Sequence, residues 1–136
     1  MLIRPRHRQV AALVWRYDDK GEVEFLTITT RRTGRWSIPK GWPIRNMTSS
    51  EAAAQEAWEE AGVRGRVNPE SLGSFTYTKA GAKNRPKMRM IASVYALHLS
   101  EQHDDYPEAG QRKRAWHSAA STIGLVQEPE LKAIIR

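Results

Sequence analysis

The strongest constraint on this chain is a short acidic helix, which its capping residues place between Thr48 and Gly62. Thr48 and the glutamate three residues later have the spacing of a capping box, in which each side chain meets the other residue's backbone amide. Gly62 supplies the left-handed residue at which many helices end. The alanine-rich segment between them carries carboxylates at Glu56, Glu59 and Glu60. At about 100° per residue, these three side chains share one face of the helix.

The acidic face has two possible explanations. Three neighbouring negative charges repel one another and weaken an isolated helix. A solvated surface is the ordinary role of a glutamate-rich helix. The alternative is a divalent cation held by the carboxylate oxygens, and this reading suits a chain that otherwise carries a formal net charge of +7.

A glycine-bearing loop precedes the helix and completes a longer pattern. Five residues separate Gly41 from Met47, seven more lead to Gln55, and the sequence then reads Glu-Ala-Trp-Glu-Glu-Ala-Gly-Val. This closely resembles the Nudix box, which is Gly, five residues, Glu, seven residues, Arg-Glu-apolar-x-Glu-Glu-x-Gly-apolar. A match without insertions at so many fixed positions is far more specific than a lone glycine-rich loop. The matching residues are Gly41, Glu56, Glu59, Glu60, Gly62 and Val63.

Two residues depart from this pattern. Met47 stands where the family usually has its first glutamate, and Gln55 replaces the arginine. The first change removes an auxiliary carboxylate. The second removes a cation that in the family braces the loop and the neighbouring glutamates, although Gln55 still donates hydrogen bonds. These departures keep open the alternative of a catalytically weakened Nudix-like module that only binds nucleotides or polyphosphate.

The three glutamates and the loop glycine suit the hydrolysis of a phosphoanhydride. That reaction needs neutralised phosphate charge, an aligned water and a base. Glu56 and Glu60 lie one turn apart and are candidate ligands for Mg²⁺, with Mn²⁺ as a possible substitute, while Glu59 is the candidate base. The resemblance implies the same roles, because in similar family members the outer glutamates bind metal and the middle one is the proposed base. The carbonyl of Gly41 is a further candidate ligand, although a glycine needed only for backbone conformation explains it equally well.

Length and composition bound the class of protein. We expect one domain spanning residues 1–136, because the chain is long enough for a core but short for two domains. The absence of cysteine excludes disulfides, thiolate metal sites and cysteine nucleophiles. The basic start leads only into a short apolar run at residues 10–15, from which neither a signal peptide nor a membrane span can be built. We therefore expect a soluble cytoplasmic protein with no membrane partner.

Strand and helix patterns alternate along the chain. The first two expected strands form a hairpin around a turn at residues 18–21. The expected strands cover residues 10–17, 23–30, 36–38, 64–67, 72–78, 88–99 and 114–117. Two further helices are expected at 119–124 and 128–135. The pattern predicts an α/β fold with a mixed sheet between helices, which is the α/β/α sandwich that the Nudix resemblance also implies.

Basic residues gather in three clusters that predict the kind of ligand. One cluster surrounds the loop before the acidic helix, a second occupies residues 79–89 and includes Lys83 and Arg85, and a third occupies residues 112–114. Clusters that converge on one site would suit a ligand bearing many phosphates, whereas solubilising charge is the ordinary alternative. The candidate substrate-binding residues are Arg31, Arg32, Arg35, Lys40, Lys113 and Arg114.

The resemblance narrows to one branch of the family. The segments Arg35-Trp36-x-x-Pro39-Lys40-Gly41 and Arg112-Lys113-Arg114-x-Trp116, with the box between them, are similar to the diphosphoinositol polyphosphate phosphohydrolases. That branch also cleaves diadenosine polyphosphates. The similarity implies that Arg31 and Lys113 contact the polyphosphate, as an arginine and a lysine do at those places in the branch.

Trp36 and Trp42 flank the loop before the acidic helix. Either ring could stack on a nucleobase or pack the loop against the core. The choice between these roles stays open at this stage.

Three functions remain compatible with the sequence. The first is a Mg²⁺-dependent hydrolase of a diadenosine polyphosphate or a diphosphoinositol polyphosphate, and the second is the binding module described above. The third is a nucleic-acid binder, suggested by a sequence pI of about 10.1. We do not expect nucleic acid as a partner, because the glutamate face would repel a phosphate backbone unless metal intervened, and no helix-turn-helix or RNA-motif pattern is present.

Overall fold

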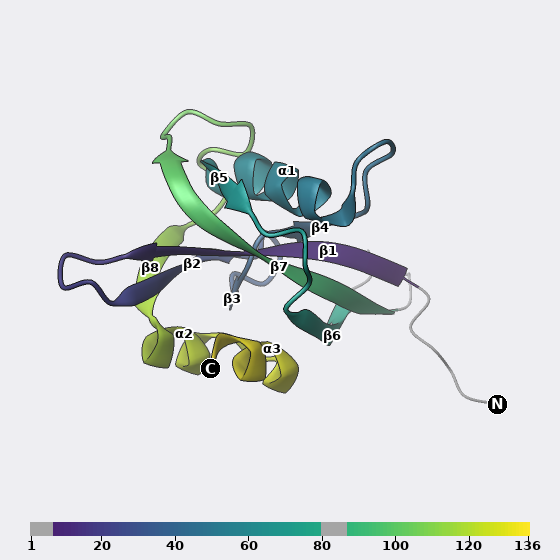
Figure 1. Ribbon diagram of the computed structural model, residues 1–136. Coiled ribbons are helices and arrows are strands. Elements are labelled where there is room, and N and C mark those ends of the chain that lie inside the picture. Colours follow the sequence, from purple (N-terminus) through teal and green to yellow (C-terminus); the bar gives the residue numbers. More distant parts are fainter. Residues whose placement is uncertain (1–6, 80–86) are drawn as a thin grey trace.

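The computed structural model describes residues 7–79 and 87–136 and shows three layers. The central layer is a mixed sheet of eight strands among these residues. Helix α1 (Ser49–Ala61) covers one face, and helices α2 (Ala119–Leu125) and α3 (Pro129–Ile135) cover the other, as Figure 1 shows. The predicted α/β sandwich with a mixed sheet between helices is therefore confirmed.

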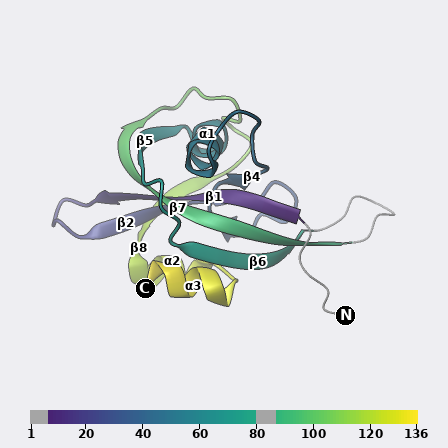
Figure 2. The same ribbon diagram turned by 45° about the vertical axis from the view of Figure 1, so that its right-hand side comes forward.

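The sheet follows the order β3-β2-β1-β7-β5, with three further strands paired to this path. Strand β4 pairs with β1, β8 pairs with β2, and β6 lies beside β7, which Figure 2 shows most clearly. The strands are β1 (His7–Tyr17), β2 (Val23–Thr29), β3 (Trp36–Ser37), β4 (Lys40–Gly41), β5 (Val63–Val67), β6 (Gly73–Lys79), β7 (Met88–Gln102) and β8 (Arg114–Ser118). Each predicted strand and helix appears within a few residues of its expected limits.

Within residues 7–79 and 87–136, strand β4 is the element that sequence reasoning missed, because we expected a loop there. It is only two residues long and pairs Gly41 with Val10 and Lys40 with Ala11. Two residues show no periodicity, so a strand this short has no sequence signal of its own. Its pairing fixes the box glycine against the central strand of the sheet.

Strands β1 and β7 form the centre of the sheet and run parallel from the pair His7–Met90 to the pair Trp15–His98. The first strand is apolar without interruption from Val10 to Val14 because both of its faces are buried. Alternate residues pack against α1 on one side and against α2 and α3 on the other. The continuous run thus explains why one helical layer is needed on each face.

Helix α1 is capped as predicted and lies close to the sheet. The Thr48 hydroxyl accepts a 3.2 Å bond from the Glu51 amide, and the Glu51 carboxylate accepts a 2.8 Å bond from the Thr48 amide. Gly62 ends the helix at φ 70°. Small fully buried side chains such as Ala53 and Ala57 form its inner face. This close packing fixes the position of the glutamates on the adjoining face.

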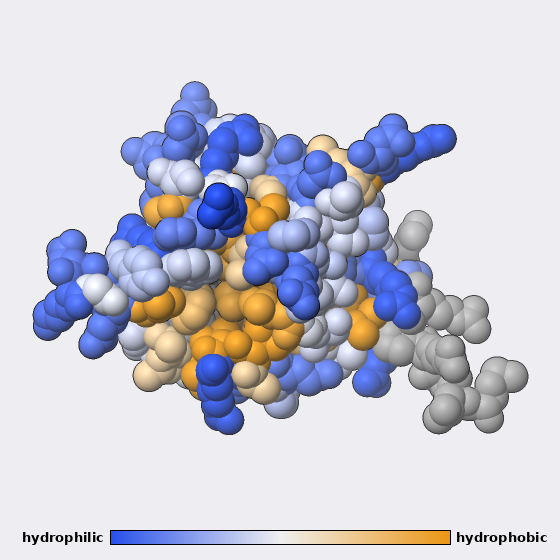
Figure 3. All heavy atoms as spheres, in the orientation of Figure 1, coloured by the Kyte–Doolittle hydropathy of each residue, from blue (hydrophilic) through white to orange (hydrophobic). Residues whose placement is uncertain are grey.

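The surface in Figure 3 separates polar and apolar residues over these layers. Hydrophilic residues cover most of this view, while hydrophobic ones gather where α2 and α3 meet the sheet. Ile123 and Ile134 are partly buried there against the second core cluster. The C-terminal helices are therefore anchored on the sheet, which fixes the segment between them.

Candidate active site

The glycine of the box, Gly41, lies directly against the Glu56 carboxylate. A Cβ built on Gly41 would overlap the Glu56 carboxylate. Gly41 does not have a positive φ. The close approach of the Glu56 carboxylate, and not a positive φ, therefore favours glycine at this position. Whether the Gly41 carbonyl binds metal stays a prediction.

Glu56 and Glu60 form an electrostatically strained pair. Burial, together with the nearby charges of Glu59 and Glu108, raises the pKa of Glu56 to about 7. Burial also raises the pKa of Glu60 to about 7, with Arg112 opposing the shift and Glu56 adding to it. Two carboxylates that resist ionisation near neutral pH would be stabilised as anions by a bound cation. We call Gly41, Glu56 and Glu60 the acidic end of the site.

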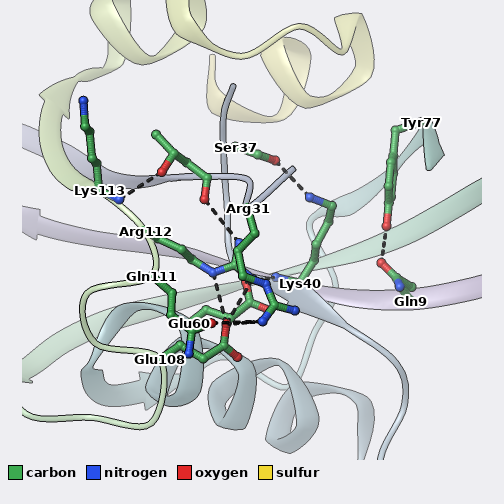
Figure 4. Close-up of polar contacts among 11 residues, drawn as sticks. Gln9, Arg31, Ser37, Lys40, Glu60, Tyr77, Glu108, Gln111, Arg112 and Lys113 are labelled. Atoms are coloured by element: carbon green, nitrogen blue, oxygen red, sulfur yellow. Dashed lines mark hydrogen bonds and ion pairs between the residues drawn. The ribbon is translucent and has the colours of Figure 1, made fainter. Parts of the chain in front are cut away.

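Arg112 lies beside the acidic end and is held there by a loop glutamate. Its guanidinium donates bonds of 3.1 and 3.2 Å to Glu108 Oε1 and a third, of 3.2 Å, to the Thr29 carbonyl. The Nη2 atom lies 3.9 Å from Glu60 Oε1, as drawn in Figure 4. Arg31 approaches the same Glu108 oxygen at 3.9 Å and donates a 3.0 Å bond to Gln111. The loop before β8 thus brings two arginines to the acidic end.

Lys40 extends from the acidic end toward the C-terminal helices, as Figure 4 shows. Its backbone amide lies 3.4 Å from Glu60 Oε1, while its ammonium lies 3.3 Å from Ser37 Oγ and 4.8 Å from the Tyr77 ring centroid. Burial lowers the pKa of Lys40 to about 8, and the charges of Glu60 and Glu128 oppose this shift. Lys40 is therefore a cation that an anionic ligand would stabilise.

A second wall of the site comes from the segment between α2 and α3. Arg35 Nη1 donates a 2.9 Å bond to Gln127 Oε1 and a 3.0 Å bond to Glu128 Oε2. Nearby, the Tyr77 hydroxyl donates to Gln9 Oε1. We call Arg35, Gln127 and Glu128 the C-terminal wall. It joins residues more than ninety positions apart in the sequence.

These groups line one cavity of about 760 Å³. Its lining brings together seven predicted site residues: Arg31, Arg32, Arg35, Lys40, Gly41, Glu56 and Glu60. Sequence reasoning missed other polar lining residues: Gln9, Tyr77, Glu108, Arg112, Gln127 and Glu128. Trp42 also lines the cavity and is 44 % exposed. The basic run at residues 112–114 signalled Arg112, although there the family pattern directed attention to Lys113, and the second basic cluster signalled Lys79, which also lines the cavity.

Three predicted site residues lie outside the cavity lining: Glu59, Lys113 and Arg114. Lys113 is fixed by backbone bonds to Thr29, and its side chain points away from Glu60 in Figure 4. Arg114 donates 2.7 Å bonds to the carbonyls of Ala61 and His103 and to Asp104. The structure therefore gives Arg114 a role in holding the loop to the end of α1. The predicted basic residues Lys83 and Arg85 lie outside the described residues.

The acidic end fits a divalent cation only if other ligands complete the coordination. Among residues 7–79 and 87–136, no three acidic, histidine or cysteine side chains converge as a ready-made metal site. The donors present are the Glu56 and Glu60 carboxylates and the neighbouring Gly41 carbonyl. Mg²⁺ commonly binds one or two carboxylates and takes its other ligands from water and substrate phosphates. The donor set is therefore compatible with Mg²⁺ in this partly protein-bound form.

Neither departure from the box falls inside the cavity. Met47 is 42 % exposed before α1, and Gln55 lines a separate shallow hollow with Arg64 and Leu97. Neither residue therefore lines the cavity that holds the acidic end.

A family model described as the NUDIX domain matches residues 7–133. This span includes the acidic end and the C-terminal wall. The chain belongs to the Nudix family. Nudix membership also agrees with the observed sandwich and with the spacing from Gly41 to Val63.

Individual relatives add detail to the family assignment. The chain is 36 % identical over 126 residues to "Nudix hydrolase 21, chloroplastic" of Arabidopsis thaliana, covering 89 % of this chain and 61 % of that protein. It is 30 % identical over 122 residues to "Diphosphoinositol polyphosphate phosphohydrolase 3-alpha" of Homo sapiens, covering 88 % of this chain and 69 % of that protein. These similarities confirm the resemblance to that branch.

A solved structure supports the fold of this Nudix chain. The crystal structure of a C. elegans Ap4A hydrolase binary complex matches with a TM-score of 0.67 at 18 % identity. The match covers 96 % of this chain and 93 % of that one. At this identity the likeness shows the fold alone.

The comparisons leave the wider organisation as a prediction. The chain spans about three fifths of the length of the first two curated relatives, 61 % and 62 %. Those relatives are named as chloroplastic and mitochondrial, so the expected cytoplasmic location stays a prediction, as does the single domain. In the described part of the chain, no helix has the length and apolar character needed to cross a membrane.

Proposed function

We propose that this Nudix chain is a Mg²⁺-dependent hydrolase of phosphoanhydride bonds in a highly phosphorylated small molecule. The candidate substrates are a diadenosine polyphosphate or a diphosphoinositol polyphosphate. The observation that carries this proposal is the position of Glu56 and Glu60 in a cavity that is otherwise rich in arginine and lysine. A ligand that is both polyanionic and able to share a cation with two carboxylates fits this combination.

The acidic end would hold the cation, and the surrounding arginine and lysine side chains would bind the phosphates. When bound, Mg²⁺ supplies positive charge that neutralises phosphate oxygens and makes a bound water more acidic. Glu56 and Glu60 bind it as anions, with the Gly41 carbonyl as a further ligand. Arg31, Arg32, Lys40 and Arg112 line the same cavity, and their charges bind the phosphate chain and set its position relative to the acidic end. Arg35 is a substrate-binding candidate at the C-terminal wall of the same cavity. We keep Lys113 and Arg114 as weaker candidates, because their side chains do not reach the lining.

Glu59 is the proposed acceptor of the proton from the attacking water. It lies on the same turn of α1 as Glu60, and its charge raises the pKa of Glu56. Its carbonyl accepts a 3.0 Å bond from the Glu108 amide, which fixes this turn to the Arg112 loop. Its side chain lies outside the cavity lining, so the assignment calls for a direct experiment.

The test is phosphate release with Mg²⁺ across dinucleoside polyphosphates, nucleoside diphosphate derivatives, capped RNA and inositol pyrophosphates. We expect wild-type release, and about a 10²- to 10⁴-fold lower kcat in Glu59→Gln. Glu70→Gln is the matched control, because Glu70 is exposed and does not line the cavity. Unchanged release in Glu59→Gln would refute the base, while no release from the wild type would refute hydrolysis.

The alternative is a binding module, which the departures at Met47 and Gln55 originally suggested. Both residues lie away from the cavity lining, and this placement favours the hydrolase. Binding of polyphosphate without any turnover in the same screen would instead support the module.

A further inference from the structure

Glu128 is an unusual residue in a cavity that otherwise suits phosphate. It is 7 % exposed, and its Oε2 atom accepts a 3.0 Å bond from Arg35. Its Oε1 atom is buried and has no hydrogen-bond partner among the described residues. Buried polar atoms are nearly always satisfied, so this orphan oxygen calls for an explanation, and Glu128 is one of the residues that line the cavity.

The position of Glu128 makes the orphan oxygen more informative. Glu128 is the N-cap residue of α3, where a side chain commonly accepts a bond from its own helix. No such bond forms here, and the residue lines the cavity with Gln127 and Pro129 on either side. The carboxylate therefore does not cap its own helix and belongs to a residue of the cavity wall.

A phosphate is the wrong partner for this oxygen. A carboxylate accepts hydrogen bonds and repels another anion. The ligand group that meets Oε1 must therefore carry an N–H or O–H donor and no negative charge. The ring of a fully phosphorylated diphosphoinositol carries no N–H or O–H donor, because each of its hydroxyls is esterified.

A nucleobase supplies what Glu128 lacks. The exocyclic amine of adenine is a donor, and the adjacent ring nitrogen is an acceptor. Glu128 Oε1 and the Arg35 guanidinium offer the complementary acceptor and donor. Trp42, half-exposed in the same cavity, adds an aromatic face of the kind on which bases stack.

We propose that Glu128, supported by Arg35, is the base-recognition residue of this cavity and selects a nucleotide over an inositol pyrophosphate. This inference rests on the proposed function, since it chooses between its two substrate classes. The phosphates then lie toward Arg112 and the acidic end, and the base lies against the C-terminal wall.

The Glu128→Gln variant tests this assignment with little change of shape. Arg35 is a donor, so the amide oxygen of glutamine will face it and the amide nitrogen will take the place of Oε1. The variant thus replaces an acceptor with a donor. We expect kcat/KM for diadenosine tetraphosphate to fall about 10- to 100-fold, with less than about a 3-fold fall for 5-diphosphoinositol pentakisphosphate.

The matched control is Glu130→Gln, two residues further along. The Glu130 carboxylate accepts bonds of 2.9 and 2.8 Å from the amide and hydroxyl of Thr76 and does not line the cavity. We expect this variant to keep the wild-type ratio of kcat/KM for the two substrates. An equal fall for both substrates in Glu128→Gln would show that Glu128 only supports Arg35, and would overturn the proposal.

A substrate series provides a second measurement that does not depend on how the variant folds. Diadenosine tetraphosphate is compared with the same molecule carrying unsubstituted purine, which lacks the exocyclic amine. We expect the wild type to lose about 10-fold in kcat/KM with the purine compound. Equal values for the two compounds would overturn the proposal.

Binding without metal separates this inference from the proposed hydrolysis. Adenosine diphosphate and inorganic pyrophosphate are titrated calorimetrically into the wild type and into Glu128→Gln. Tighter binding of adenosine diphosphate that disappears in the variant supports base recognition, even if no substrate is hydrolysed. The same preference in both proteins would overturn base recognition, even if hydrolysis is observed.

Discussion

The acidic end and the C-terminal wall of the cavity are built in different ways. The acidic end comes from one segment of 23 residues, Gly41 to Val63, in which a two-residue strand and a capped helix fix the spacing. The C-terminal wall joins Arg35 to residues 92 and 93 positions away. The first is a local motif and the second depends on the whole fold. This difference suggests that the reaction is set locally and the choice of substrate by tertiary packing.

The largest expected effect within the acidic end tests whether its carboxylates are required for the reaction. We expect Glu56→Gln to lower kcat about 10²- to 10³-fold, since a charged cation ligand becomes neutral. The apparent Mg²⁺ affinity should fall as well, which titration of activity against Mg²⁺ measures. Glu70→Gln is again the control. Unchanged Mg²⁺ dependence in Glu56→Gln would show that Glu56 does not bind the cation.

The next effect tests the close contact between Gly41 and Glu56. We expect Gly41→Ala to lower kcat/KM about 10-fold with little cost in stability, because the new methyl displaces the end of the flexible Glu56 side chain and not a rigid part of the core. Gly124→Ala is the matched control, since a Cβ there meets nothing within 4 Å. It lies in α2, so it should stabilise the protein by about 0.5–1 kcal/mol. Normal activity in Gly41→Ala would show that activity does not depend on the close contact between Gly41 and the Glu56 carboxylate.

A third, smaller effect tests whether Arg114 contacts the substrate. Arg114 donates bonds to Ala61, His103 and Asp104, so Arg114→Lys should mainly destabilise the protein, by about 2 kcal/mol in denaturant unfolding. KM should change less than about 2-fold at temperatures where the variant is folded. A KM raised about 10-fold without loss of stability would return Arg114 to the substrate-binding residues.

The same contrast explains what the sequence could predict. The acidic end was predictable because its chemistry repeats at fixed spacing on one helix, and the fold was predictable because strands β1 and β7 have continuous or alternating apolar patterns. Glu128 and Gln9 have no such signal. Each is one polar residue at an element boundary or within a strand, and only the pairing of distant strands brings it to the cavity.

Arg112 and Arg114 illustrate the same limit within one basic run. Their order in sequence does not indicate which guanidinium faces the acidic end, because that depends on how the loop from His103 to Lys113 folds. The structure places Arg112 beside Glu60 and turns Arg114 toward the end of α1. A family pattern could suggest the run but could not rank its members.

The smallest effect concerns pH and compares the acidic end with the rest of the molecule. The Glu56 and Glu60 pKa values are raised from 4.5 to about 7 in the folded chain. Between these values the folded state keeps protons that the unfolded state has lost, so stability falls as pH rises through about 7. Without metal, we expect the wild-type melting temperature to fall by a few degrees between about pH 5 and about pH 8, relative to a double variant with glutamine at both positions. Excess Mg²⁺ should remove most of this difference, because the cation stabilises the ionised carboxylates at the upper end of the range. Parallel pH profiles for the two proteins would show that burial of this pair does not limit stability, and the strain assigned to the acidic end would then be absent.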